Sequence, residues 1–228
     1  MLSVRELNAY YGRAHILGDV SLDVAKGETA VLLGRNGAGK STTLKSIMGW
    51  IRPRSGEIAF DGRRIDRLPT WRVARSGLGY VPEDRRIFTD LSVAENLDVG
   101  RRGEGWTPEK LFALFPNLAE AKDRPAGRIS GGEQQMLAIA RTLMGNPSCL
   151  LLDEPSEGLA PVILEQLAAA LKSLKATGMA VLLSEQNWRF ASAVADRAYV
   201  IEKGRIRFAG TTAELAGDGA AHARYLAV

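Results

Sequence analysis

Hydrophobic and polar positions along the chain follow two periods, one typical of strands and one typical of helices. Three runs of continuous apolar residues, at 29–33, 150–152 and 179–183, predict strands that are buried on both faces. Alternating apolar and polar residues at 20–24 predict a strand with one exposed face. Because these strands alternate with segments of helical spacing, we expect an α/β fold whose largely parallel sheet is covered on both faces.

Shorter patterns predict the remaining elements. Further strands are expected at 2–7, at 56–62 together with a turn, at 79–82, where a proline ends the run, and in a hairpin over 199–208. Helical spacing extends over 40–49, 130–144 and 161–175, over most of 85–145 apart from a loop at 102–105, and into the tail from 212.

The composition narrows the class of protein. The chain has 228 residues, of which 46% are hydrophobic and 25% charged, as expected for one large globular domain or a domain with a subdomain. The net charge of +4 is spread along the chain, which favours an ordinary solvated surface over a nucleic-acid-binding one. A single cysteine, Cys149, excludes an internal disulfide. Early charges argue against a signal peptide, and no apolar run reaches about 18 residues, so we expect a soluble cytoplasmic protein.

A glycine-rich segment follows the first buried strand and fits the pattern G-x-x-x-x-G-K-S/T. Its residues are Gly34, Arg35, Asn36, Gly37, Ala38, Gly39, Lys40 and Ser41, with Thr42 next in the helix. Glycines allow the backbone N–H groups to approach phosphate oxygens, and the helix that follows directs its positive end at the same anion. Lys40 is expected to reach the β- and γ-phosphates and Ser41 to bind Mg²⁺. A chance match is disfavoured by the preceding strand, and the pattern of dinucleotide-binding loops does not fit.

An acidic pair, Asp153-Glu154, ends the second buried strand. This position lies at the carboxyl edge of the sheet, where ligands of open α/β folds bind. Beside a phosphate loop, Asp153 is expected to hold Mg²⁺ and Glu154 to deprotonate the attacking water. Taken alone, the pair also fits an ordinary strand end followed by a proline turn.

The segment Ser130-Gly131-Gly132-Glu133 opens a predicted helix. The spacing S-x-x-E is that of a helix capping box, which is a sufficient local explanation. A cap does not need two glycines, however, and bare backbone at a helix N-terminus forms a second anion site. One nucleotide in one subunit has no use for two such sites, which indicates a partner chain.

Together these motifs resemble the nucleotide-binding subunits of ABC transporters over essentially the full length. The segment from Ser130 to Gln134 resembles that family's signature, L-S-G-G-Q. Three loop segments are similar in sequence to those of the branched-chain amino-acid importers, whose near relatives are urea importers. These segments are Tyr80-Val81-Pro82-Glu83, the loop 153–161 and Glu185-Gln186-Asn187.

The resemblance implies an architecture and partners. The fold would be a phosphate-loop NTPase core with a mainly parallel sheet, a small antiparallel β subdomain and an inserted helical subdomain. The whole chain, 1–228, would be a single ABC ATPase domain, with its nucleotide-binding core at 1–84 and 145–228 and the helical subdomain at 85–144. Two copies, identical or paralogous, would pair head to tail around ATP and Mg²⁺. A groove near 83–96 would receive a short helix of an integral-membrane permease.

The resemblance also assigns residues and shows departures. Tyr11 matches the aromatic residue that stacks on adenine, and Ser130, Gly131, Gly132 and Glu133 would face the partner's ATP. Glu83 takes the place of a glutamine at the Mg²⁺ site, Gln186 the place of the switch histidine, and Ala160 the place of an aspartate, while Glu133 replaces the signature glutamine. The importer group shares these features, so we interpret them as marks of the subgroup.

The expected function is that of an ATP-hydrolysing subunit at the cytoplasmic face of the inner membrane, peripherally bound. It would power uptake of branched-chain or hydrophobic amino acids, with a periplasmic binding protein acting indirectly. Urea or short amides are the alternative cargo. A non-transport ABC ATPase acting on nucleic acid or in protein assembly is the alternative class, although no nucleic-acid partner is expected.

Overall fold

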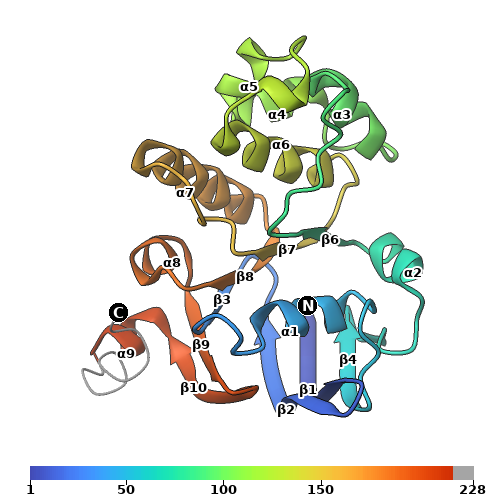
Figure 1. The fold of residues 1–228 in the computed structure, drawn as a ribbon, viewed down its shortest axis with the longest axis vertical. Coiled ribbons are helices and arrows are strands. Elements are labelled where there is room, and N and C mark those ends of the chain that lie inside the picture. Colours follow the sequence, from blue (N-terminus) through green and yellow to red (C-terminus); the bar gives the residue numbers. More distant parts are fainter. Residues whose placement is uncertain (218–228) are drawn as a thin grey trace.

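The computed structural model describes residues 1–217, and a six-stranded sheet crosses the middle of the molecule (Figure 1). Its strand order is β10-β9-β3-β8-β7-β6, and all neighbours are parallel except β10, which pairs antiparallel with β9. The strands are β3 (Thr29–Leu33), β6 (Leu78–Val81), β7 (Cys149–Asp153), β8 (Ala180–Glu185), β9 (Arg197–Glu202) and β10 (Arg205–Thr211). The three predicted buried strands are confirmed and lie side by side in the centre as β3, β8 and β7.

A second, four-stranded sheet is antiparallel, with the order β2-β1-β4-β5. It consists of β1 (Leu2–Tyr11), β2 (Ala14–Val24), β4 (Ser55–Phe60) and β5 (Arg63–Arg64). Helix α1 (Lys40–Ile47) packs between the two sheets, because Leu44 and Ile47 share one hydrophobic core with residues of β1, β2, β3 and β7. The helix that follows the phosphate loop is therefore held in place by both sheets.

Alternate residues of the central strands supply two separate cores. Leu32 of β3 packs toward α1, whereas its neighbours Val31 and Leu33 pack toward the other face. Because successive side chains of a strand point to opposite faces, a strand covered on both sides has to be apolar throughout. This explains why the predicted central strands are continuous hydrophobic runs.

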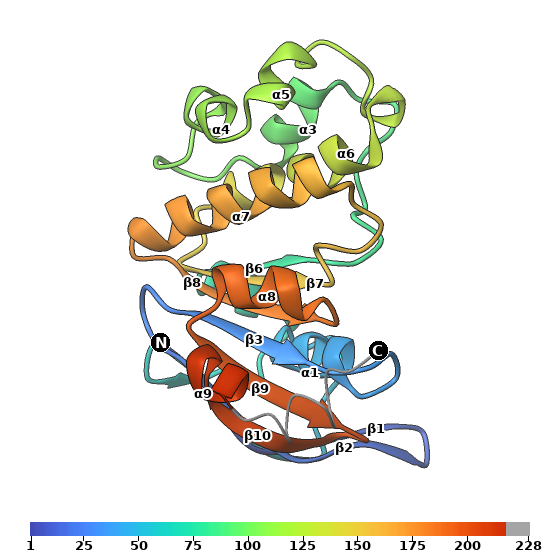
Figure 2. The ribbon, with the colours of Figure 1, turned by 90° about the vertical axis from the view of Figure 1, so that its left-hand side faces the viewer.

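Helix α7 (Pro161–Ala176) lies across the second face of the sheet and separates it from a group of helices (Figure 2). That group contains α3 (Val93–Gly100), α4 (Pro108–Leu114), α5 (Pro116–Glu120), a 3₁₀ turn at Ala126–Arg128 and α6 (Gly131–Leu143). Helices α3 and α6 both begin with a capping box, formed by Ser92 with Glu95 and by Ser130 with Glu133. Such caps satisfy N–H groups that the first helical turn leaves unpaired.

The prediction of a mostly helical segment over 85–145 is wrong for its first eight residues, 85–92, which contain no helix. Arg85 and Arg86 have φ values of +59° and +49°, a region that few L-residues occupy and that breaks a helix. The predicted loop at 102–105 is confirmed between α3 and α4. Sequence patterns missed α2 (Thr70–Arg75) and α8 (Trp188–Val194), which are short.

The chain ends, within the described residues, in the helix α9 (Thr212–Gly217). The first part of the predicted helical tail is thereby confirmed, and the rest of it, 218–228, lies outside the described residues. None of the helices within 1–217 combines the length and the apolar character that a membrane crossing requires.

Candidate nucleotide site

The phosphate loop turns sharply from the end of β3 into α1. Gly39 occupies the N-cap with φ +112°, and a side chain on Gly34 would place its Cβ 2.5 Å from the carbonyl oxygen of Ile201. Both positions therefore require glycine, one for its backbone conformation and one for lack of space. A cavity of about 330 Å³ lies beside the loop, lined by residues 34–38 and 200–203.

Lys40 is buried at the base of this loop. Its Nζ donates hydrogen bonds to the carbonyl oxygens of Gly34 at 2.7 Å and Arg35 at 3.1 Å. It also forms an ion pair of 3.0 Å with Oε1 of Glu154, and only 3% and 7% of the two side chains are exposed. Since burying an unpaired charge is costly, each of these charges depends on the other. The pair brings the loop and the acidic strand end together.

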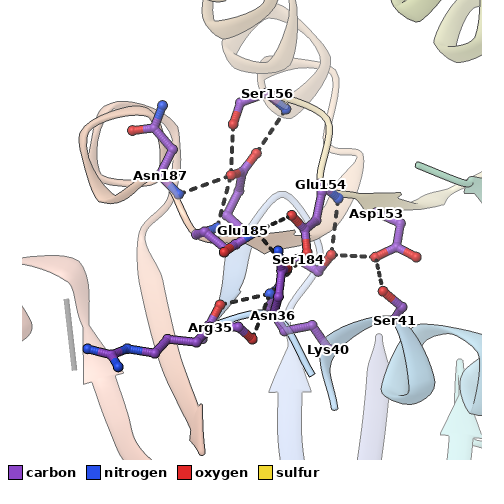
Figure 3. A network of polar contacts seen from close by, with 12 residues as sticks. Arg35, Asn36, Lys40, Ser41, Asp153, Glu154, Ser156, Ser184, Glu185 and Asn187 are labelled. Atoms are coloured by element: carbon purple, nitrogen blue, oxygen red, sulfur yellow. Dashed lines mark hydrogen bonds and ion pairs between the residues drawn. The ribbon is translucent and has the colours of Figure 1, made fainter. Parts of the chain in front are cut away.

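Asp153 accepts three hydrogen bonds at the carboxyl end of β7. Ser41 Oγ donates to its Oδ1 at 2.9 Å, Ser184 Oγ donates to the same atom at 2.6 Å, and Tyr80 Oη donates to its Oδ2 at 2.9 Å (Figure 3 shows the two serines). Burial, together with the nearby Asp153 carboxylate, raises the pKa of Tyr80 well above its usual range, so the phenol remains a donor. The orientation of the carboxylate is thus fixed from two sides.

Glu154 lies next to Asp153 and also contacts Gln186. Gln186 Nε2 donates to Glu154 Oε2 at 2.6 Å and to Asn36 Oδ1 of the phosphate loop at 2.8 Å. Glu154 has φ +47°, and its N–H donates to the carbonyl oxygen of Ser184 at 3.0 Å. The carboxylate is therefore held between Lys40 and Gln186, at the edge of the phosphate loop.

Glu185, which the sequence interpretation left without a role, is buried next to this group. Its carboxyl group points toward Ser156 (Figure 3). Ser156 donates to it from its backbone N–H at 3.0 Å and from Oγ at 2.8 Å, and the N–H groups of Gln186 and Asn187 donate at 3.2 and 3.3 Å. Burial nevertheless raises the pKa of Glu185 to about 7. Its carboxyl group connects the loop after β7 with the loop after β8. Two polar residues ending a buried strand, Ser184 and Glu185, were the available sequence signal.

Glu83 faces the same region from the loop after β6. It lines a cavity of about 220 Å³ together with Tyr80, Asp153 and Lys45. Burial and the neighbouring carboxylates of Glu157, Glu154 and Asp153 raise the pKa of Glu83. Ser41, Glu83 and Asp153, the three predicted Mg²⁺ ligands, thus lie around one side of the loop.

The signature segment lies apart from the phosphate loop. Ser130 caps α6, its Oγ accepting from the Glu133 N–H at 3.2 Å and Glu133 accepting from the Ser130 N–H at 2.7 Å. Figure 1 shows α6 among the upper helices, on the far side of α7 from α1. A Cβ on Gly132 would lie 2.8 Å from Ile163 of α7, so packing is an independent reason for this glycine. The predicted binding of a partner's ATP by this segment stays a prediction.

Tyr11 lies at the tip of the β1–β2 hairpin, opposite Ala14, with 51% of its surface exposed. It is not among the described residues that line the cavity beside the phosphate loop. Its stacking on adenine therefore also stays a prediction.

The chain is similar in sequence to known proteins. A family model described as "ABC transporter" matches residues 17–157. The chain is 46% identical over 220 residues to the high-affinity branched-chain amino acid transport ATP-binding protein BraG of Pseudomonas aeruginosa, with 94% of each chain covered. It is 37% identical over 228 residues to the "Probable branched-chain amino acid transport ATP-binding protein LivF" of Archaeoglobus fulgidus, again with 94% of each chain covered.

A more distant relative and a solved structure agree on the family. The lipopolysaccharide export system ATP-binding protein LptB of Escherichia coli is 36% identical over 218 residues, covering 92% of this chain and 90% of LptB. The crystal structure of a nucleotide-free ATP-binding cassette from an ABC transporter superposes with a TM-score of 0.85 at 26% identity, covering 97% and 96% of the two chains. The chain belongs to the ABC transporter family and is one of its ATP-binding, ATP-hydrolysing subunits.

Proposed function

We propose that the chain hydrolyses Mg²⁺-bound ATP to power the uptake of branched-chain or other hydrophobic amino acids. The similarity to BraG and LivF supports this cargo. The subunit would bind peripherally at the cytoplasmic face of the inner membrane, to integral-membrane permease subunits. A periplasmic substrate-binding protein would deliver the amino acid from the other side.

The side chains around Lys40 support a division of roles. The loop amides of 34–39 and Lys40 hold the phosphates, and Thr42 follows them in α1. Tyr11 is assigned to the adenine ring. Glu154 is the general base that accepts a proton from the attacking water, and Gln186 donates a hydrogen bond to the γ-phosphate.

The donor set on the other side of the loop fits Mg²⁺. The Ser41 hydroxyl and the Asp153 carboxylate lie 2.9 Å apart, with Glu83 nearby, and all three offer hard oxygen ligands. Within residues 1–217 no group of three His, Cys, Asp or Glu side chains is arranged to hold a metal ion by itself. When bound, Mg²⁺ would neutralise charge on the phosphates.

The observation that carries the proposal is the position of Glu154. Its carboxylate touches Lys40 at 3.0 Å and Gln186 at 2.6 Å, so the base lies where a γ-phosphate on the loop would be attacked. In a complex with ATP, Lys40 would move toward the phosphates. This movement would release the Glu154 carboxylate to act on water. The contact with Gln186 would keep that carboxylate oriented.

A second copy of a cassette completes the site in this proposal. Ser130, Gly131, Gly132 and Glu133 lie at the start of α6, which is on the far side of α7 from α1 (Figure 1), so we assign them to the nucleotide of a partner and not to that of their own phosphate loop. Head-to-tail pairing would bring them to the partner's ATP, where the α6 N-terminus can bind anionic oxygens. We assign residues 85–144 to the helical subdomain and 1–84 with 145–228 to the nucleotide-binding core.

The permease would bind in a groove of about 450 Å³. Residues of α2, β6, α3, α6 and neighbouring loops line it, and its exposed apolar side chains include Trp50, Phe88 and Val99. An apolar groove between helices suits a short amphipathic helix of a partner. Its position overlaps the segment 83–96 that the family resemblance implicates.

Glu154→Gln tests the proposal. The variant is expected to bind ATP, to hydrolyse it more slowly by a factor of roughly 10²–10⁴, and to accumulate as an ATP-bound dimer. Glu165→Gln, at an exposed position of α7, is the matched control and should hydrolyse ATP at the wild-type rate. Undiminished turnover by Glu154→Gln, measured as phosphate release, would remove the general base from the mechanism.

Uptake measurements separate the alternative cargoes. Cells without this chain should lose uptake of radiolabelled leucine and keep uptake of urea. Loss of urea uptake alone would favour the urea-importer alternative. ATP hydrolysis stimulated by DNA or RNA would instead favour the non-transport class.

A further inference from the structure

Tyr80 lies at the wall between two hollows of the surface. The groove of about 450 Å³ and the smaller cavity of about 220 Å³ share four residues, namely Trp50, Tyr80, Pro82 and Arg86. Asp153 and Glu83 line only the smaller one. A single strand residue therefore faces both the surface proposed to bind the permease and the acidic end of β7.

The hydroxyl group of Tyr80 is bonded on the acidic side. It donates to Asp153 Oδ2 at 2.9 Å, while Ser41 and Ser184 donate to the other oxygen, Oδ1. The serine bonds leave Oδ2 without a further described donor, so the tyrosine hydroxyl fixes the direction in which that oxygen points. Such outer partners of a metal-binding carboxylate set its orientation and its affinity.

The ring of Tyr80 is in contact on the groove side. It meets the ring of Trp50 edge to face, with centroids 5.1 Å apart and an interplanar angle of 75°. Trp50 is 43% exposed, and the guanidinium of Arg86 lies 5.3 Å from its ring centroid. A partner helix that enters the groove would contact Trp50 and so press on the ring that carries the hydroxyl group.

We propose that Tyr80 is a positioning residue through which occupation of the groove adjusts the Asp153 carboxylate, and with it the binding of Mg²⁺-ATP. The proposal rests on the proposed function, because it assigns Mg²⁺ to Asp153 and the permease to the groove. The link is short: Trp50 ring, Tyr80 ring, Tyr80 hydroxyl, Asp153 carboxylate. Trp50 contacts Tyr80, and Tyr80 contacts Asp153. A shift of the Trp50 ring by a partner therefore reaches the Asp153 carboxylate through Tyr80 alone.

Tyr80→Phe tests the hydroxyl group, and Tyr199→Phe is its matched control. Tyr199 also carries a hydrogen-bonded hydroxyl, which accepts from the Asp23 N–H at 2.9 Å and donates to the Asp23 carbonyl oxygen at 3.0 Å, away from the acidic cluster. Affinity for the non-hydrolysable analogue AMP-PNP is measured by calorimetric titration across Mg²⁺ concentrations and in EDTA. Thermal unfolding of both variants reports any purely structural effect.

For Tyr80→Phe, the Mg²⁺ concentration that gives half of the metal-dependent gain in affinity should rise about tenfold, with affinity in EDTA unchanged. Tyr199→Phe should leave both quantities at their wild-type values. Equal Mg²⁺ dependence in the two variants would overturn the role of the hydroxyl. Absence of any Mg²⁺-dependent binding in the wild type would instead refute the proposed function.

Trp50→Ala tests the connection to the groove, with Trp71→Ala as the control. Trp71 is also an exposed tryptophan, 53% exposed on α2, whose ring contacts Arg72 and Arg75. Trp50→Ala should shift the Mg²⁺ dependence in the same direction as Tyr80→Phe, by a smaller factor, and Trp71→Ala should not shift it. If Trp50→Ala and Trp71→Ala behave alike, the groove is not connected to Asp153 through these rings.

Discussion

Replacing Glu185 by glutamine should change how the stability of the fold depends on pH. The carboxyl group is 2% exposed, and burial raises its pKa from an ordinary value of 4.5 to about 7, against the opposing effect of hydrogen bonds from Ser156. Between these two values the folded state holds a proton that the unfolded chain releases. Stability therefore falls as the pH rises through this range, and it is constant with respect to this group below 4.5 and above 7.

The size of the Glu185 pKa shift sets the size of the effect on stability. At about 1.36 kcal/mol for each pH unit, a pKa raised from 4.5 to about 7 corresponds to about 3 kcal/mol of stability lost on ionisation. Glutamine resembles the protonated carboxyl group and has no such loss. The free energy of unfolding of Glu185→Gln minus that of the wild type should thus increase by about 3 kcal/mol from pH 4 to pH 8.

The assay is urea unfolding followed by circular dichroism at intervals between those pH values, with the slope m checked for constancy. Glu165→Gln, at an exposed position, controls for the removal of one charge. A difference between Glu185→Gln and wild type that stays flat across the range, or that decreases with pH, would refute the account of a buried carboxyl group whose hydrogen bonds do not offset its desolvation.

Three further variants test the site and its supports. Lys40→Ala should lose ATP affinity by titration and leave Glu154 buried without its partner, and wild-type binding would contradict the loop assignment. Gly34→Ala places a methyl group 2.5 Å from the Ile201 carbonyl oxygen, so thermal unfolding should occur at a lower temperature, and an unchanged midpoint would show that β9 yields easily. Ser130→Ala removes the α6 cap at a cost of about 1 kcal/mol in urea unfolding, and an effect near zero would mean that water replaces the hydroxyl.

Local spacing in the sequence determined the chemistry of the site. Gly34, Gly39, Lys40 and Ser41 are recognisable because a phosphate loop needs these residue types at fixed separations, directly between a strand and a helix. Asp153 and Glu154 are recognisable because a buried parallel strand is apolar up to its carboxyl end. The central strands and the longer helices were predictable for the same reason, since burial imposes a period on neighbouring residues.

Tertiary structure decided which distant residues meet. The ion pair between Lys40 and Glu154, and the hydrogen bond from Tyr80 to Asp153, depend on the strand order that places β7 between β6 and β8 and near α1. Gly132 was interpreted from the sequence as bare backbone of an anion site, yet its lack of a side chain also makes room for Ile163 of α7. Residues 85–92 were wrongly predicted as helical, because the residue pattern does not reveal that the backbone of Arg85 and Arg86 is in the left-handed region.

The difference between what the sequence determined and what the tertiary structure decided has a physical cause. Periodicity, turns and loop motifs are set by interactions within a few residues, so the sequence alone specified the central strands, the phosphate loop and the acidic strand end. The environment of Glu185, and the place of Tyr80 between groove and carboxylate, arise from packing of segments far apart in the chain. Their desolvation and contacts exist only once the sheet is assembled, and so only the folded structure could reveal them.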